Sequence, residues 1–194
     1  MKLTPDMLLS AYCQGIFPMG HDDGSIGWYD PDPRAIFPLD TFHVPRRLAR
    51  TVRKGIFELR VDSAFPQVIA SCAELTPARD ETWISGTVLD AYVQLHRLGF
   101  AHSVECWREG RLVGGLYGVA IRGLFAGESM FHRERDASKV AFVYLVERLR
   151  RGGYTLLDSQ FIVGDHFHQF GVSEIPRTEY KSRLAAALNI SASF

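Results

Sequence analysis

Two short apolar segments of this sequence each carry a polar group that a hydrophobic core would not accept. Glu128 lies in Gly-Glu-Ser-Met-Phe at positions 127–131, and Asp158 and Gln160 lie in Leu-Leu-Asp-Ser-Gln at positions 156–160. Burying a carboxylate without partners costs roughly several kcal/mol. Each segment therefore needs internal hydrogen bonds or a polar ligand.

The Asp-x-Gln spacing is suited to holding an amine. Side chains two apart on a strand share a face, so Asp158 and Gln160 are predicted to project together while Ser159 points away. The carboxylate would accept a hydrogen bond from the Gln160 amide and leave the amide oxygen free for an incoming amine. The structural alternative is that Asp158 caps the turn after the strand and Gln160 is solvated.

Glu128 has apolar neighbours in Phe125, Met130 and Phe131. An anion in such surroundings suits a cationic ligand. The alternative is a salt bridge to a nearby arginine, Arg133 or Arg135.

A third candidate is a basic segment with no acid in it, at positions 45–54. Pro45 can begin a helix there, which places Arg46, Arg50 and Arg53 on one face. Arg47 and Lys54 add to the same charge cluster. The alternative is a solvated surface helix, which normally mixes signs to gain i to i+4 pairs, so from this segment alone phosphate binding and a solvated face are equally open.

The length and composition of the chain limit its possible fold and function classes. The chain has 194 residues, 46% apolar and 23% charged, with 22 basic and 22 acidic side chains. This length is enough for one hydrophobic core, or for a main domain with a small appendage. The net charge of zero gives no indication of a nucleic-acid partner. The longest nearly charge-free run, 140–146, is too short to cross a bilayer, and positions 1–6 do not resemble a signal peptide. We expect a cytoplasmic monomer without membrane contact.

A metal site has one argument in its favour, the pair His166 and His168. No Cys-x-x-Cys or His-Glu-x-x-His spacing accompanies it, so we expect neither metal nor cofactor.

The predicted elements alternate in type along the chain. Helices are predicted at 4–14, 45–54, 63–75, 87–98, 136–152 and 176–188, strands at 57–61, 101–107, 111–120, 124–131, 155–161 and 172–175, and a long aromatic-bearing loop at 15–38. The three central strands read as an antiparallel meander, and the helix after them is apolar almost all round, so it should be buried. This order is typical of an α+β, GNAT-like mixed sheet with flanking helices.

Several motifs, in order and over nearly the whole chain, resemble the bacterial leucyl/phenylalanyl-tRNA–protein transferases. They are Ala-Tyr-Cys-Gln-Gly-Ile-Phe-Pro at 11–18, Pro-Asp-Pro-Arg at 31–34, Glu-Thr-Trp-Ile at 81–84, His-Ser-Val-Glu-Cys-Trp at 102–107, the glycine-rich run 112–118, Gly-Glu-Ser-Met-Phe at 127–131, Ala-Ser-Lys at 137–139 and Glu-Ile-Pro-Arg at 174–177.

The resemblance implies a function and a domain plan. Such an enzyme moves Leu or Phe, with Met as a further candidate, from aminoacyl-tRNA to the α-amino group of proteins that begin with Arg or Lys. This transfer marks the acceptor for degradation in an N-degron pathway. The implied plan is a small N-terminal domain at 1–36 and a GNAT-like domain at 37–194.

The resemblance also implies site residues. Asp158 and Gln160 match the catalytic Asp-x-Gln pair, and Glu128 matches the acid expected to bind the acceptor. The basic cluster Arg46, Arg47, Arg50, Arg53 and Lys54 falls where tRNA would bind. The pocket for the Leu or Phe side chain maps onto Met19, Trp83, Leu116, Phe125, Phe142, Leu145, Leu149 and Leu157.

Two other functions stay open from the sequence. An acetyl-CoA-dependent N-acyltransferase on the same sheet would need a pyrophosphate-binding Gly-rich turn at a helix start. The run Arg-Leu-Val-Gly-Gly-Leu at 111–116 comes close but lies in a predicted strand. A non-enzymatic tRNA-binding module would explain the basic helix but leave Asp158 and Gln160 without a role.

Overall fold

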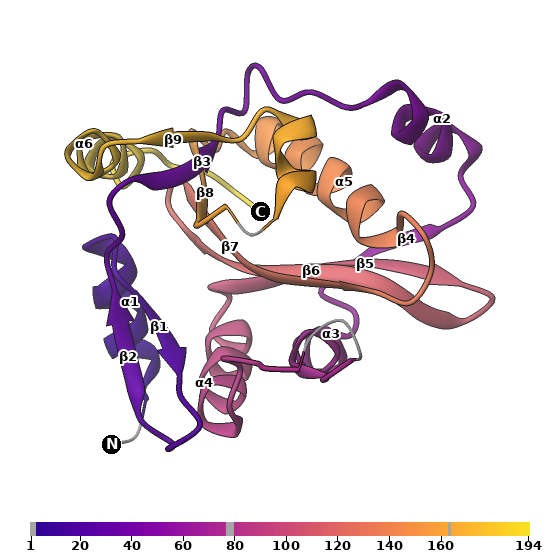
Figure 1. The fold of residues 1–194 in the computed structure, drawn as a ribbon. Coiled ribbons are helices and arrows are strands. Elements are labelled where there is room, and N and C mark those ends of the chain that lie inside the picture. Colours follow the sequence, from indigo (N-terminus) through magenta and orange to yellow (C-terminus); the bar gives the residue numbers. More distant parts are fainter. Residues whose placement is uncertain (1–2, 77–79, 163) are drawn as a thin grey trace.

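The computed structural model describes residues 3–76, 80–162 and 164–194, and these form one large sheet, one small sheet and flanking helices (Figure 1). The large sheet has the strand order β4-β5-β6-β7-β8-β3-β9. The strand bounds are β3 Arg34–Phe37, β4 Glu58–Val61, β5 Ala101–Arg108, β6 Arg111–Ile121, β7 Leu124–His132, β8 Leu156–Gln160 and β9 Ser173–Ile175.

The centre of the large sheet is the predicted meander. β5, β6 and β7 run antiparallel, whereas β8 lies parallel to β7 after a helical crossover. Glu109 and Arg122 occupy left-handed backbone positions in the two tight turns, each next to a glycine. The α+β class and the mixed sheet with flanking helices are confirmed.

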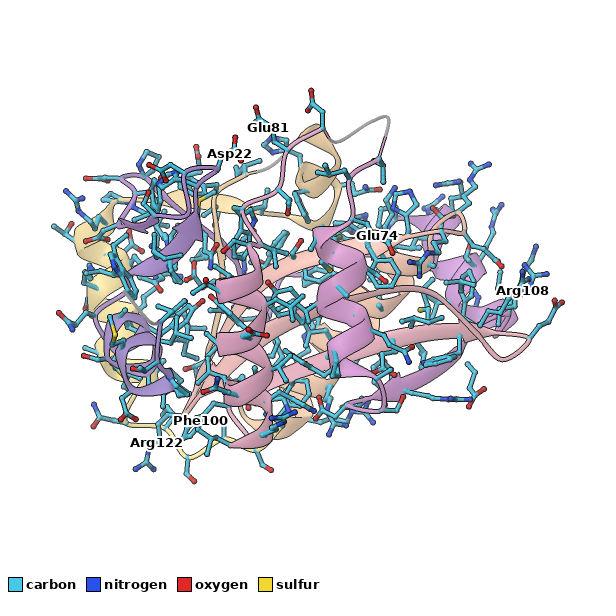
Figure 2. All side chains as sticks on the ribbon, turned by 90° about the horizontal axis from the view of Figure 1, so that it is seen from below. Asp22, Glu74, Glu81, Phe100, Arg108 and Arg122 are labelled. Atoms are coloured by element: carbon cyan, nitrogen blue, oxygen red, sulfur yellow. The ribbon has the colours of Figure 1, made fainter. Side chains whose placement is uncertain are left out.

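Helices cover both faces of this sheet. α5 (Ala137–Gly152) lies on one face and contacts β5, β6 and β7, and its apolar residues are buried as predicted. α3 (Phe65–Ala73) and α4 (Gly86–Arg97) lie side by side over the other face (Figure 2).

The N-terminal part is more ordered than the predicted loop. After α1 (Pro5–Cys13), which Thr4 caps as expected, β1 (Phe17–Gly20) and β2 (Ile26–Tyr29) pair in a two-stranded antiparallel sheet. The prediction of an irregular stretch at 15–38 was therefore wrong in part, because two short strands find each other and β3 joins the large sheet. The expected domain boundary at residue 36 falls inside β3.

The remaining elements lie around this frame. α2 (Arg46–Lys54) contacts α5, the 3₁₀ helix η1 spans Asp165–Phe170, and α6 (Arg177–Ala187) packs near β8. Within the described residues, none of the helices combines the length and the apolar character needed to cross a membrane.

The sheet opens between β7 and β8. Their parallel pairing covers Leu124–Ala126 on β7 and ends where Ala126 faces Asp158. Beyond that point β7 continues to His132, paired with β6 alone, and β8 ends at Gln160 with a φ of 63°. Because a left-handed residue turns an L-amino acid chain away from the strand direction, β8 leaves the sheet here. The split therefore separates the end of β8 from the continuing part of β7 within the same sheet.

Candidate active site

A cavity of about 470 Å³ lies at the split between β7 and β8. One side of it consists of apolar side chains from the core cluster around α5. The other side, next to α1 and α4, has the apolar Met19 and Trp83 but also the Glu128 carboxylate, and is called the polar side here. Its lining includes Met19, Phe37, Cys72, Glu81, Thr82, Trp83, Leu116, Tyr117, Gly127, Glu128, Ser129, Met130, Phe142, Leu145, Leu157, Asp158, Ser159, Gln160, Phe161 and Phe167.

A bulge in β7 turns Glu128 to the polar side. Tyr117 on β6 faces Ser129, but the next residue, Gly118, faces Gly127, so Glu128 is one residue extra in its strand. Without the bulge, Glu128 would alternate in step with Met130 and share its face. With the bulge, the carboxylate lies against α1 and α4.

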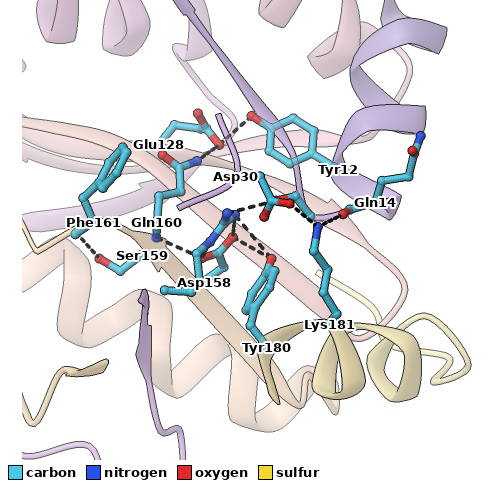
Figure 3. Close-up of polar contacts among 12 residues, drawn as sticks. Tyr12, Gln14, Asp30, Glu128, Asp158, Ser159, Gln160, Phe161, Tyr180 and Lys181 are labelled. Carbon is cyan, nitrogen blue, oxygen red and sulfur yellow. Dashed lines mark hydrogen bonds and ion pairs between the residues drawn. The ribbon is translucent and has the colours of Figure 1, made fainter. Parts of the chain in front are cut away.

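Three polar groups bind the Glu128 carboxylate. The Tyr12 hydroxyl donates to Oε1 at 2.6 Å and the Gln160 side-chain amide donates to Oε1 at 2.8 Å (Figure 3). The Tyr92 hydroxyl donates to Oε2 at 3.2 Å. The two tyrosine hydroxyls also lie within hydrogen-bonding distance of each other. Each hydroxyl has one proton to donate, so around an ionised carboxylate only two of the three contacts among Tyr12, Tyr92 and Glu128 are hydrogen bonds at one time.

Glu128 makes no ion pair within the described part of the chain. The predicted alternative partners are engaged elsewhere: Arg133 binds Glu74 at 2.8 Å, and Arg135 lies 4.0 Å from Asp136. Burial raises the pKa of Glu128 to about 7, and the negative charge of Asp158 adds to the rise, while hydrogen bonds from Tyr12 and Tyr92 lower it. Glu128 is therefore a carboxylate that titrates near neutral pH.

Asp158, unlike Glu128, has a cation among its direct hydrogen-bond partners. Arg34 donates to it as a fork, from Nε to Oδ1 at 2.9 Å and from Nη2 to Oδ2 at 2.7 Å. The Tyr180 hydroxyl donates to Oδ2 at 2.8 Å, and the backbone N–H of Gln160 donates to Oδ1 at 2.9 Å. Asp158 and Arg34 are each only 1% exposed. Burial lowers the pKa of Arg34, but the hydrogen bonds and charge of Asp158 outweigh this, so the pKa lies above its ordinary value.

The structure corrects one part of the predicted geometry. Asp158 holds the backbone of Gln160 and not its side-chain amide, which Glu128 binds instead. The strand alternation that predicted the pairing fails because Gln160 has a left-handed backbone. Gln160 Nε2 is occupied by Glu128, and no described group donates to its Oε1, so the amide oxygen is available to the cavity. The sequence analysis expected Asp158 to orient the Gln160 amide, whereas in the structure Glu128 accepts from the amide nitrogen.

Most of the predicted side-chain pocket is assembled. Met19, Trp83, Leu116, Phe142, Leu145 and Leu157 all line the cavity. Phe125 and Leu149 do not line it but lie fully buried in the adjoining core, Phe125 against Tyr154 and Phe194.

The predicted basic helix forms as α2. Arg46, Arg47, Arg50, Arg53 and Lys54 are all exposed, whereas Leu48 is buried. Arg47 also reaches Asp136 at 3.1 Å. The cluster therefore offers charge at the surface, apart from the cavity lining.

The pair His166 and His168 was the sequence's one argument for a metal site. The side chain of His166 lies outside those that the structure describes. Among the residues that are described, no group of three or more His, Cys, Asp and Glu side chains is arranged to hold an ion.

Sequence reasoning gave no role to four residues of this network, Arg34, Tyr12, Tyr92 and Tyr180. Arg34 and Tyr12 lie in motifs that the sequence comparison singled out, and Arg34 is a charged residue directly before the apolar run Ala-Ile-Phe at 35–37. That placement is a signal for a buried ion pair, since a buried arginine needs a carboxylate. For Tyr92 and Tyr180, nothing in the local pattern distinguishes a site residue from a core residue.

An apolar cavity with a few convergent polar groups, one of them with a perturbed pKa, is the usual form of an enzyme's substrate site. The family comparison agrees with this class. The model of the leucyl/phenylalanyl-tRNA protein transferases matches residues 36–185, and the model of their N-terminal domain matches residues 1–32. The chain belongs to this family.

Curated relatives with this name are similar over nearly the whole chain. The protein from Herpetosiphon aurantiacus is 58% identical and covers 100% of this chain and 98% of its own. Those from Phenylobacterium zucineum and Salinibacter ruber are 56% and 52% identical, covering 96% and 97% of this chain and 85% and 82% of their own. A GCN5-related N-acetyltransferase-like structure from Streptococcus suis is 16% identical, covers 82% of this chain and 58% of that one, and has a TM-score of 0.36, too distant to carry an argument.

Proposed function

We propose that this enzyme transfers Leu or Phe from aminoacyl-tRNA to the α-amino group of proteins that begin with Arg or Lys. Family membership supports the reaction class. The observation that carries the site assignment is the apolar cavity that has Gln160 and Glu128 on its wall. Met is a further candidate donor, since its side chain is apolar and flexible.

The donor side chain would occupy the apolar side of the cavity. Leu116, Met130, Phe142, Leu145 and Leu157 surround that space and are packed in one core cluster with α5. Such a pocket favours apolar side chains but distinguishes single methylene groups by only about 1–3 kcal/mol. Transfer of more than one apolar amino acid follows from this.

The acceptor amine would meet the donor ester at Gln160. The ester is already activated, so attack by the amine needs neither a cofactor nor a covalent enzyme intermediate. The amine nitrogen bonds to the ester carbonyl carbon, the bond from that carbon to the ribose oxygen breaks, and the proton lost by the amine ends on the ribose oxygen. A free α-amino group has a pKa of about 7.7–8.0, so part of it is neutral near pH 7 and orientation is the main requirement.

Gln160 and Glu128 would divide the work of orientation. Glu128 accepts from the Gln160 amide nitrogen, which directs the amide oxygen to accept a hydrogen bond from the amine. The charge that Glu128 carries above about pH 7 also attracts a cationic acceptor side chain, because no arginine or lysine of the described residues is in direct contact with it, although the charge of Arg34 lowers its pKa from a distance. An amide is too weak a base to keep the proton, so Gln160 acts by positioning.

The remaining assignments concern partners and place. The exposed cations of α2 would bind tRNA phosphates, Glu128 the acceptor terminus, and the chain would act as a monomer in the cytoplasm, where charged tRNA is made. Residues 1–36 would form the smaller N-terminal unit and residues 37–194 the transferase unit.

One assay with several arms tests the proposal. Purified protein is supplied with labelled Leu-, Phe-, Met- or Ser-tRNA, or with acetyl-CoA, and with peptides that begin with Arg, Lys or Ala. We expect Leu and Phe on the Arg and Lys peptides, little Ser transfer and no acetyl transfer. Raising the salt should weaken tRNA binding steeply, and changing Arg46, Arg50 and Arg53 to Ala should flatten that dependence.

Three results would contradict the proposal. Equal Ser transfer would argue against the apolar pocket, and acetylation would favour the acetyl-CoA alternative. tRNA binding without any transfer would favour a binding module.

A further inference from the structure

Arg34 is a buried arginine whose guanidinium has partners in several elements of the fold. It lies at the start of β3, the strand next to β8, and is 1% exposed. Besides its fork onto Asp158, its Nη1 donates to the Gly15 carbonyl at 2.9 Å. Its guanidinium also lies 4.8 Å from the Phe17 ring centre and 4.4 Å from that of Tyr180. The group is therefore fixed between the N-terminal segment, β8 and α6.

The Asp158 carboxylate is fully used by this arrangement. Oδ1 accepts from Arg34 Nε and from the Gln160 backbone, and Oδ2 accepts from Arg34 Nη2 and from Tyr180 (Figure 3). A carboxylate offers about four lone-pair sites. Asp158 therefore has no site left for a substrate proton, and what it can do is hold the backbone of Gln160.

The backbone conformation of Gln160 has to be stabilised by its surroundings. Its left-handed backbone is unfavourable for a residue other than glycine, and such conformations persist only where the surroundings fix them. The 2.9 Å hydrogen bond to Asp158 is the contact that fixes this one from within the same strand. From this position the side-chain amide reaches Glu128.

We propose that Arg34 is a positioning residue for the transfer reaction, acting through Asp158 on Gln160. Its fork sets the plane of the carboxylate, the carboxylate sets the backbone of Gln160, and the backbone sets where the amide oxygen meets the amine. Lysine would keep the charge but not the planar two-pronged geometry. This inference rests on the proposed function, because it assumes that Gln160 orients the acceptor.

A double-mutant cycle separates this role from a purely structural one. The readout is the single-turnover rate of Leu transfer to a peptide that begins with Arg, together with the Leu-tRNA concentration that half-saturates it. Arg34→Lys should lower the rate by about tenfold or more and change half-saturation by less than about threefold. In a Gln160→Ala background the same change should lower the rate by less than about threefold, because the group it positions is gone.

The matched control is Arg60→Lys. Arg60 makes the same kind of fork, onto Glu58 at 2.8 Å and 3.0 Å, but on the exposed β4 edge of the sheet. Its transfer rate should stay within about twofold of the unmodified protein, since exposed pairs contribute little. If Arg34→Lys fails to fold, Tyr180→Phe removes one hydroxyl from the same carboxylate and tests the same chain of contacts. Tyr180→Phe should lower the transfer rate by less than Arg34→Lys does, and it should have no effect on the rate in the Gln160→Ala background.

The outcomes are distinguishable. An unmodified protein that transfers no Leu would refute the proposed function itself. An active protein in which folded Arg34→Lys keeps its rate would overturn only the role of Arg34. So would a loss that multiplies in full with that of Gln160→Ala, since the two residues would then act independently.

Discussion

Asp158 and Glu128 are carboxylates at the same split in the sheet, yet their surroundings differ in one decisive way. Asp158 faces a buried guanidinium at 2.7 Å, whereas Glu128 faces two tyrosine hydroxyls and an amide. A cation in direct contact compensates the burial of the first charge, whereas the direct partners of the second are neutral donors and the charge of Arg34 acts on it only without contact. The partners of a buried carboxylate therefore decide whether it stays ionised and structural or can change its charge near neutral pH. Asp158 holds the backbone in place, and Glu128 can respond to pH and to a cationic substrate.

The largest expected difference is in stability. Asp158→Ala should lower the free energy of unfolding by about 3–5 kcal/mol, because it leaves Arg34 buried without its partner. Glu128→Gln should change it by less than about 1 kcal/mol, since no cation is orphaned and an amide can still accept a hydrogen bond. Urea unfolding at pH 6, where Glu128 mostly keeps its proton, measures both.

A surface pair supplies the control for this comparison. Glu58→Ala removes the exposed partner of Arg60 and should cost at most about 1 kcal/mol. Equal losses for Asp158→Ala and Glu128→Gln would break the contrast between the two carboxylates.

The second expected effect is on the pH dependence of transfer. Because burial raises the pKa of Glu128 to about 7, the carboxylate gains its charge as the pH rises through that value. The kcat/KM for an Arg peptide should rise with an inflection near pH 7, followed by the rise from the α-amine. Glu128→Gln should abolish the first inflection and lower kcat/KM at pH 8 by roughly ten- to hundredfold, the value of a hydrogen bond to a charged group.

A neutral acceptor sharpens this test. If Glu128 also attracts the cationic side chain of the acceptor, a peptide beginning with Ala should lose less than an Arg peptide, whereas equal losses would mean that Glu128 acts only through Gln160. A Glu128→Gln variant that retains the inflection near pH 7 would assign that titration to another group.

The smallest expected effect is a shift of the same inflection. Tyr12→Phe removes the hydroxyl that donates at 2.6 Å, and Tyr92→Phe removes the one at 3.2 Å. Both hydrogen bonds lower the pKa of Glu128, so losing either should move the inflection upward, by about one unit or less and further for Tyr12. Tyr154→Phe, at a tyrosine without contact to Glu128, should leave it in place. A downward shift in Tyr12→Phe would contradict the hydrogen-bond arrangement.

Local patterns were sufficient for the larger elements of the fold. The meander at 101–131 and the buried helix that follows it are formed by contacts close in sequence, so apolar periodicity and turn residues predicted them. The short strands β1, β2 and β3 were missed because each has four residues in a stretch rich in Gly, Pro and Asp. β3 is a strand because β8 and β9, paired with it across about 120 or more residues of sequence, lie on its two sides.

In the site, too, some features could be predicted from local sequence and others depend on residues that are distant in the sequence. A polar residue in an apolar run is visible in the sequence, and so Glu128, Asp158 and Gln160 could be singled out. Their partners could not, since Arg34 is 124 residues from Asp158 and Tyr12 is 116 from Glu128. Phe125 and Leu149 illustrate the limit for the cavity, because an apolar residue looks the same whether it lines a cavity or fills the core beside it.

The sequence by itself therefore determined which side chains would be costly to bury, and that some polar contact must compensate them. Only the tertiary structure decided what that contact is, through one extra residue in β7, one left-handed residue at the end of β8 and an arginine brought in by β3. The physical reason is that the cost of burying a charge belongs to the residue, whereas its compensation depends on distances between groups that only the folded chain brings together.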